Sequence, residues 1–234
     1  MNGDKNKQIA PQVVLAQHGN KEACKKLYAA YYKNIFFISK LMSCDSVAAM
    51  NLTEEIFIEM FKSVSKLSDY TAFEQWLYSI AVNMCKPDAA NSQGETQSLV
   101  RDMSDIVSGI RRSVADNDKF AFERIIMNLL ETVISALPFD AKAIFLYKNF
   151  ALLDNDKIAL IEKKDESDIA AGADAVDKFI FTIGEKLRGD GVDISPFAKD
   201  WNSTLCYLAS RVFVPDSVHG KVSDFLGVDV NPFK

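Results

Sequence analysis

Aromatic and amide side chains gather in one short stretch, residues 70–85, which runs YTAFEQWLYSIAVNMC. Trp76 and Tyr78 offer flat rings with a polar end, and Asn83 offers an amide that both donates and accepts hydrogen bonds. Such groups can bind a ligand, but the same spacing also builds the apolar face of a packed helix. Residues 70–85 can therefore be core alone, or core that also carries a contact surface, and both interpretations stay open.

Acidic side chains crowd residues 154–168, where LDNDKIALIE has the close carboxylate spacing of a calcium loop. A calcium loop also needs a central glycine and a full set of oxygen ligands, and this stretch lacks both. Caps at the starts of short helices are a sufficient role for Asp154, Asp165 and Asp168. The stretch therefore predicts helix caps and no metal site.

The cysteines and histidines are few and far apart. The chain has four cysteines, without a CxxC pair, and two histidines. These residues are Cys24, Cys44, Cys85 and Cys206, with His18 and His219. Cysteines in apolar helical patterns are ordinarily buried free thiols. Because the sequence also has no nucleophile-base-acid set and no glycine-rich phosphate loop, we expect no metal, no cofactor and no enzyme activity.

The composition is that of a globular protein that buries a core. Of 234 residues, 48% are hydrophobic and 25% charged, and the formal net charge is -5. No apolar run approaches the ~20 residues of a membrane span. The N-terminus, MNGDKNKQIAPQ, lacks the apolar core of a secretory signal, so we expect a cytoplasmic protein with no membrane contact. No segment carries the basic excess that contacts with nucleic-acid phosphates usually need.

Apolar residues recur with a period near 3.6 almost everywhere, and no alternating run indicates a strand, so the sequence predicts an all-α fold. Asn20 is a suitable N-cap for the first strong helix. One stripe on that helix comprises Ala23, Leu27, Tyr31, Ile35, Ile38 and Met42. A second stripe comprises Leu52, Ile56, Met60, Val64 and Leu67, with Phe57 and Phe61 beside it. Glu54, Glu55 and Glu59 fall on the opposite side of that second helix, so we expect them in solvent.

A third helix is expected within residues 70–85. Thr71 and Glu74 have the capping-box spacing, in which each side chain satisfies the other residue's free amide, so we expect the helix to start there. Phe73, Trp76, Leu77 and Ile80 then follow at helical spacing. Pro87 limits its continuation, because proline has no amide hydrogen.

The remaining chain predicts further helices. The polar residues 86–97 are expected to be a linker, followed by a helix from Leu99 to Val114. Five more helices are expected at about 122–137, 140–150, 156–162, 169–187 and 200–213, with another near 216–226. Trp201, Leu205, Leu208 and Val212 form a stripe that either folds back on the second domain, which is the preferred interpretation, or offers an apolar surface to a partner.

Three segments, in order, resemble the extracytoplasmic-function sigma factors of bacterial RNA polymerase. AQHGNKEACKKLYAAYYKNIFFISKL is similar to the opening helix of that family, and NLTEEIFIEMFKSV to its clamp-docking helix. FEQWLYSIAVNMC resembles the Phe-x-x-Trp-Leu-x-x-Ile-Ala-x-Asn helix that opens promoter DNA. These matches cover about residues 13–85. More weakly, SALPFDAKAIFLYKNFALLDNDKIALIEKKDES is similar to the family's second, helix-turn-helix domain.

The resemblance implies a layout, two partners and two sets of site residues. It implies a sigma region 2-like domain over 1–88, a helical linker over 89–117, a diverged helix-turn-helix domain over 118–190 and a helical extension over 191–234. The implied partners are core RNA polymerase, promoter DNA and a regulatory protein. The residues expected to dock on polymerase are Asn51, Leu52, Glu54, Glu55, Phe57 and Glu59. The residues expected to contact DNA are Trp76, Tyr78, Asn83 and Lys86.

The chain departs from the family pattern where the family is basic. An ungapped match places Ala170, Gly172, Ala175 and Asp177 at basic positions of the last helix. Phosphate contacts supply most nonspecific affinity, and arginine is the usual partner of guanine edges, so an acidic helix replaces neither. Two hypotheses follow: a sigma factor that directs polymerase to a promoter, or a relative that has lost DNA binding and acts as a protein-interaction or regulatory module. A helical scaffold unrelated to transcription is the third.

Overall fold

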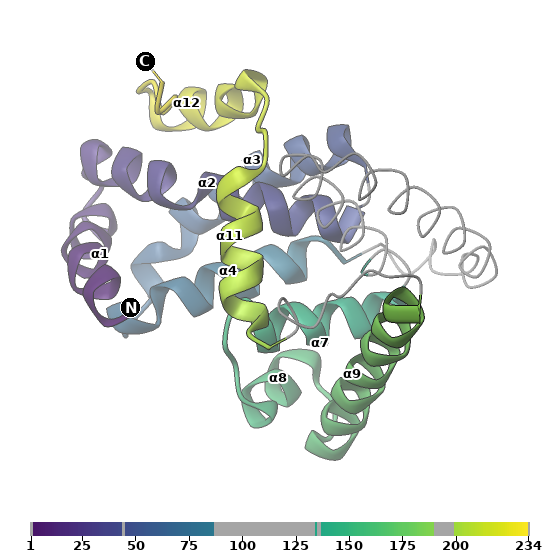
Figure 1. The fold of residues 1–234 in the computed structure, drawn as a ribbon. Helices are drawn as coiled ribbons and strands as arrows, with labels where there is room; N and C mark the ends of the chain where they lie inside the picture. Colours follow the sequence, from purple (N-terminus) through teal and green to yellow (C-terminus); the bar gives the residue numbers. More distant parts are fainter. Residues whose placement is uncertain (1, 44, 87–133, 135–136, 190–198, 234) are drawn as a thin grey trace. The chain divides into compact units, whose positions relative to one another are not determined.

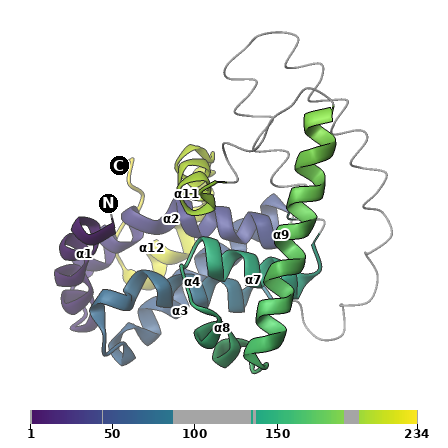
Figure 2. The ribbon, with the colours of Figure 1, turned by 60° about the horizontal axis from the view of Figure 1, so that its bottom comes forward.

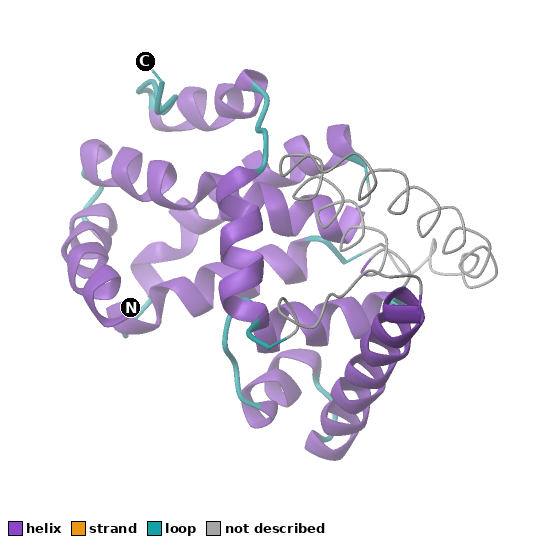
Figure 3. Cartoon of the chain, in the orientation of Figure 1, coloured by secondary structure: helices purple, strands orange, loops and turns teal. Residues whose placement is uncertain are grey.

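The computed structural model describes residues 2–43, 45–86, 134, 137–189 and 199–233. Within these residues the chain forms helices and no strand, as Figure 3 shows, which confirms the all-α prediction. The chain separates into two compact units, one of residues 1–85 with 209–234 and one of residues 86–208. The last part of the predicted extension therefore groups with the first unit and does not stand alone.

The first unit is built around one long, largely buried helix, α2 (Lys21–Ser43). Around it lie α1 (Asn2–Gln17), α3 (Ser46–Ser63) and α4 (Phe73–Met84), as Figures 1 and 2 show. The Asn20 side chain accepts a hydrogen bond from the Ala23 amide at 2.9 Å, which confirms the predicted N-cap. Every member of the predicted stripe from Ala23 to Met42 is buried, so the 3.6 period identified the core face of α2 correctly.

Two features of this unit differ from the sequence prediction. Helix α1, which contains Pro11, is not among the helices predicted from the sequence. The Gln17 amide at the end of α1 donates to the carbonyl oxygens of Val64 (3.0 Å) and Leu67 (2.7 Å). These bonds lie beside the 3-10 turn η1 (Val64–Lys66), and they tie α1 to the end of α3.

The capping box predicted for Thr71 and Glu74 is wrong. Helix α4 begins at Phe73, and its N-cap, Ala72, makes no side-chain cap bond. Thr71 lies instead in the 3-10 turn η2 (Tyr70–Ala72), where Asp69 accepts its amide at 2.9 Å and its hydroxyl at 2.6 Å. These bonds lower the pKa of the Asp69 carboxyl. The Asp69 carboxylate, two residues away, thus bonds Thr71 in place of the predicted capping box.

The C-terminal residues complete the first unit. The 3-10 turn η3 (Asp216–His219) and helix α12 (Gly220–Leu226) both pack against α3, which confirms a helix near 216–226. Helix α12 ends in the left-handed conformation at Gly227 (φ 62°), the usual glycine cap.

The second unit contains α7 (Phe139–Asn149), α8 (Asn155–Glu162) and α9 (Glu166–Gly189), close to the predicted ranges. Helices α8 and α9 are joined by a short turn in which Lys163 adopts the left-handed conformation (φ 54°). Helix α11 (Trp201–Arg211) starts in this unit, where Asn202 donates to the Asn149 carbonyl at 3.0 Å. The predicted linker, apart from Lys86, and the predicted helices at 99–114 and 122–137, apart from Ile134 and Leu137, lie outside the described residues.

Candidate functional site

The predicted docking helix, α3, starts at a well-defined cap and exposes one polar face. The Asp45 side chain accepts the Ala48 amide at 2.6 Å, which fixes the first turn. Asn51, Glu55 and Glu59 are exposed and follow one another four residues apart, so they form one row along the helix. Leu52 is half-buried beside that row. These four residues are accessible, as a docking surface requires.

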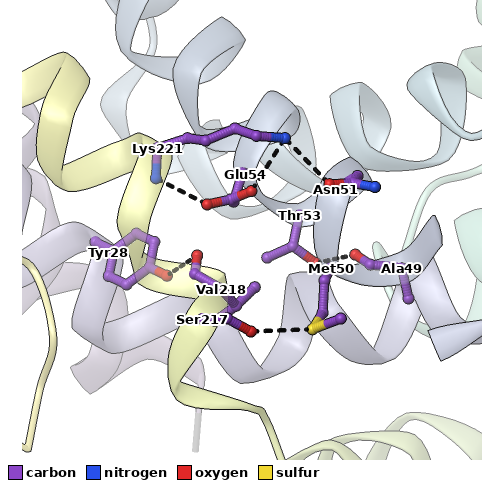
Figure 4. A network of polar contacts seen from close by, with 9 residues as sticks. All are labelled: Tyr28, Ala49, Met50, Asn51, Thr53, Glu54, Ser217, Val218 and Lys221. Atoms are coloured by element: carbon purple, nitrogen blue, oxygen red, sulfur yellow. Dashed lines mark hydrogen bonds and ion pairs between the residues drawn. The ribbon is translucent and has the colours of Figure 1, made fainter. Parts of the chain in front are cut away.

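Glu54 is buried, contrary to the prediction of a fully exposed acidic face. Glu54 is only 5% exposed, because the C-terminal residues cover it. As Figure 4 shows, its Oε1 accepts the backbone amide of Lys221 at 2.8 Å and its Oε2 lies 3.3 Å from the Lys221 Nζ. The same Nζ donates to Asn51 Oδ1 at 3.1 Å. A carboxylate that loses water needs such partners, and residue 221 supplies two of them.

Contacts from α2 hold the same C-terminal residues in place. The Tyr28 hydroxyl donates to the Val218 carbonyl at 3.2 Å and lies 2.7 Å from His219 Nδ1. A hydroxyl has one proton, so both contacts are satisfied when Nδ1–H donates to the tyrosine oxygen. Burial, and then the nearby Glu54 charge, raise the pKa of Tyr28 far above its usual value. Ser217 donates to the sulfur of Met50 at 3.4 Å (Figure 4).

Phe57 lies in the core and not on the docking face. It has no exposed surface, and its ring packs 4.6 Å from that of Tyr28 and 6.3 Å from that of Phe61, measured between centroids. Phe57 therefore supports α3 from beneath and cannot touch a partner in this arrangement.

The residues expected to contact DNA are divided between core and surface. Tyr78 is 2% exposed, and its hydroxyl donates to Glu74 Oε1 at 2.8 Å and accepts from Asn34 Nδ2 at 2.6 Å. Burial, followed by the Glu74 charge, raises the pKa of Tyr78 well above its usual value. Trp76 is half-buried, with its ring 5.9 Å from that of Phe73. These two rings are thus wholly or partly committed to packing.

Asn83 and Lys86 are exposed. Lys86 is nevertheless paired, with its Nζ 3.1 Å from Glu162 within the second unit. Residues 70–85 therefore form a 3-10 turn and a largely buried helix, α4, whose exposed polar end is Asn83.

The exposed surface of the first half of α9 is acidic where a DNA-binding helix is basic. Glu166, Asp168, Asp174 and Asp177 are all exposed, and Lys178 is the first basic residue of the helix. Gly172 is half-buried, and a Cβ built there would lie 2.7 Å from Ile144 Cδ1 on α7. Any side chain at position 172 would require the tip of Ile144 to shift, so glycine lets α9 approach α7 closely at this position.

The structure lends no support to a metal centre among the described residues. No group of three histidine, cysteine or acidic side chains there is placed to hold a metal ion. Asp154 occupies the N-cap position of α8, as expected, although its side chain makes no cap bond. None of the helices in the described part of the chain has a stretch long and apolar enough to cross a membrane.

Sequence reasoning missed the C-terminal residues that cover α3, namely Val218, His219 and Lys221, and Tyr28 on α2, which holds them. The only local signal was the apolar spacing of Val218, Val222 and Phe225 around Lys221. That spacing indicates a helix with a buried side, and does not identify the helix it meets. Comparison of the chain with protein-family models and with curated proteins finds no match.

Proposed function

We propose that this chain is a sigma-factor-like protein of bacterial transcription initiation that docks on core RNA polymerase through α3. The observation that carries the proposal is the exposed row of Asn51, Glu55 and Glu59, on the helix that resembles the clamp-docking helix of sigma factors. The arrangement around it supports the same idea, because the three resembling segments form α2, α3 and α4, which pack together.

The row can supply only part of the binding energy. An exposed carboxylate–guanidinium pair contributes about 0.2–1 kcal/mol, and two such pairs fall short of the ~8 kcal/mol of a micromolar complex. Apolar contact must provide the remaining binding free energy. Leu52, at the edge of the row, contributes little apolar area because it is half-buried. The docking surface must therefore include apolar area next to the acidic row.

The test is a fluorescence-anisotropy titration of the labelled full chain with purified bacterial core polymerase. We expect saturable binding that an authentic sigma factor displaces, weakened about tenfold or more by the double variant Glu55→Lys, Glu59→Lys. A matched control is Glu22→Lys, an exposed residue in the first turn of α2. Equal affinity of the wild type and the double variant would remove α3 from the docking assignment, and absence of binding would reject the proposal.

The first candidate is a complete sigma factor that also directs polymerase to promoter DNA. In this candidate Asn83, Trp76 and Lys86 contact the DNA. A second candidate is a relative that kept polymerase docking or another protein contact and lost DNA binding. The acidic exposed surface of α9 and the burial of Tyr78 favour this second candidate. Duplex promoter DNA, titrated at low and at moderate salt, separates the two, because phosphate contacts give a steep fall of affinity with salt. A flat, negligible response supports the second candidate.

A further inference from the structure

The last residues of the chain occupy the surface beside the proposed docking row. We define the C-terminal cover as residues 215–231, which include η3 and α12. Its valines 218, 222 and 230 have no exposed surface, and η3 and α12 pack on α3. Its polar contacts reach both ends of the same stretch of α3, at Met50 and at Glu54 (Figure 4). The apolar area that docking requires next to the acidic row is thus already covered by the chain itself.

The contact with Glu54 is of a kind that another molecule can replace. The Lys221 side chain is 52% exposed while that of Glu54 is 6% exposed, so the cation approaches a sheltered carboxylate from the solvent side. Removal of the Lys221 ammonium would leave Glu54 without its counter-charge, although the backbone amide of residue 221 still bonds Oε1, and a sheltered carboxylate without a counter-charge is costly. A basic side chain of a partner can restore the same pairing. Exchange of one cation for another therefore lets a partner compete directly with the cover.

The connection to the cover has the form of a hinge. Helix α11 ends at Arg211, and the Lys33 ammonium on α2 donates to the Ser210 carbonyl at 3.2 Å, which anchors that end. Residues 212–215 (VFVP) are not helical; Phe213 is 83% exposed, whereas Val212 and Val214 are buried. Rotation about residues 212–214, with exposure of Val212 and Val214, would let the cover leave α3 without moving the anchored end of α11.

We propose that the C-terminal cover is an intramolecular competitor of polymerase for α3. The competing partner presents a basic side chain to Glu54 beside small apolar side chains that take the place of Val218 and Val222. The covered state binds polymerase weakly, and release of the cover exposes Glu54 and the apolar area around it. This inference rests on the proposed function, since the competition concerns the same helix.

The test compares the full chain with its variant Lys221→Glu, which sets two carboxylates against each other at the contact. Lys26→Glu is the matched control, because it makes the same charge change at an exposed position on α2. We expect Lys221→Glu to bind core polymerase at least tenfold more tightly than the wild type and Lys26→Glu to bind like the wild type. A lesion that merely damaged the fold would weaken binding, so the direction of the change identifies competition.

Hydrogen exchange of α3 provides a readout that does not need polymerase. We expect faster exchange at residues 46–63 and 216–226 in Lys221→Glu, with the rest of the first unit unchanged. The milder Lys221→Met keeps the apolar stem of the side chain and should move both readouts in the same direction, by less. Lys221→Met replaces Lys221→Glu in both measurements if Lys221→Glu does not fold.

The outcomes separate the two proposals. If the wild type and Lys221→Glu bind polymerase equally, the proposal of competition is overturned and the docking proposal stands. Weaker binding by both Lys221 variants, with intact exchange elsewhere, would also overturn it, because the cover would then be part of the docking surface. Failure of every variant to bind, even with faster exchange of α3, would reject docking and with it the competition. A dimer of Lys221→Glu with slow α3 exchange would assign the surface to a second copy of the chain, against the proposal.

Discussion

Glu54→Ala should destabilise the first unit by about 2–3 kcal/mol. The backbone amide of Lys221 bonds to a charged acceptor at 2.8 Å, and such a bond is worth about 1.5–3 kcal/mol. The ion pair with Lys221 adds at most about 1 kcal/mol, because the lysine end is half-exposed and screened. Glu54→Gln keeps an acceptor for the amide, so we expect it to cost only about 0.5–1 kcal/mol.

Urea unfolding followed by circular dichroism measures these losses, with Glu55→Ala as the control. Glu55 is exposed on the next position of α3, and we expect its change to stay within about 0.5 kcal/mol. The stability lost in Glu54→Ala cannot exceed the free energy that holds the C-terminal cover on α3, because at that point the cover dissociates. Hydrogen exchange at residues 216–226 shows whether the cover stays bound or dissociates in this variant. Wild-type stability together with wild-type exchange in Glu54→Ala would refute the assignment of Glu54 as the anchor of the cover.

Two further predictions concern ionisable groups whose pKa is raised by burial. Burial raises the pKa of the Cys85 thiol to about 12, so at pH 8 its thiolate fraction is on the order of 10⁻⁴. In the native protein, iodoacetamide should therefore label the exposed Cys206 and spare Cys85, as mass spectrometry can measure. Equal labelling of the two cysteines would contradict this prediction. Tyr28, Tyr31 and Tyr78 have pKa values raised by burial above the ordinary 10.0. Because only the unfolded chain releases these protons, stability should be intact below pH 10 and fall by up to about 1.4 kcal/mol per pH unit and tyrosine above it; unchanged urea midpoints between pH 9 and pH 11 would contradict the burial.

The helices of the first unit follow from local patterns, and the sequence predicts most of them for that reason. The stripe from Ala23 to Met42 is buried throughout, and Asn20 caps its helix as its side chain allows. Prediction failed where two local signals competed. Thr71 had the spacing for a capping box, but Asp69 lies closer along the chain and accepts both of its donors.

The candidate site was predictable only in part. Exposed Glu55 and Glu59 match the expectation of an acidic face, because residues four apart on an amphipathic helix share one side, whereas Glu54, expected beside them, is buried. Phe57 and Tyr78 were expected to contact partners, and the structure places both in the core. Their apolar neighbours at helical spacing carried that information in the sequence, but the resemblance to a family outweighed it.

By itself the sequence determined the all-α class, the positions of most described helices and the side of α2 that meets the core, because these depend on side chains within a few turns of one another. The tertiary structure decided the environment of Glu54. Nothing within α3 distinguishes Glu54 from Glu55 as a carboxylate, and the partner that shelters Glu54 stands 167 residues away in the chain. Burial of a charge depends on which remote segment covers it, and no local periodicity contains that information.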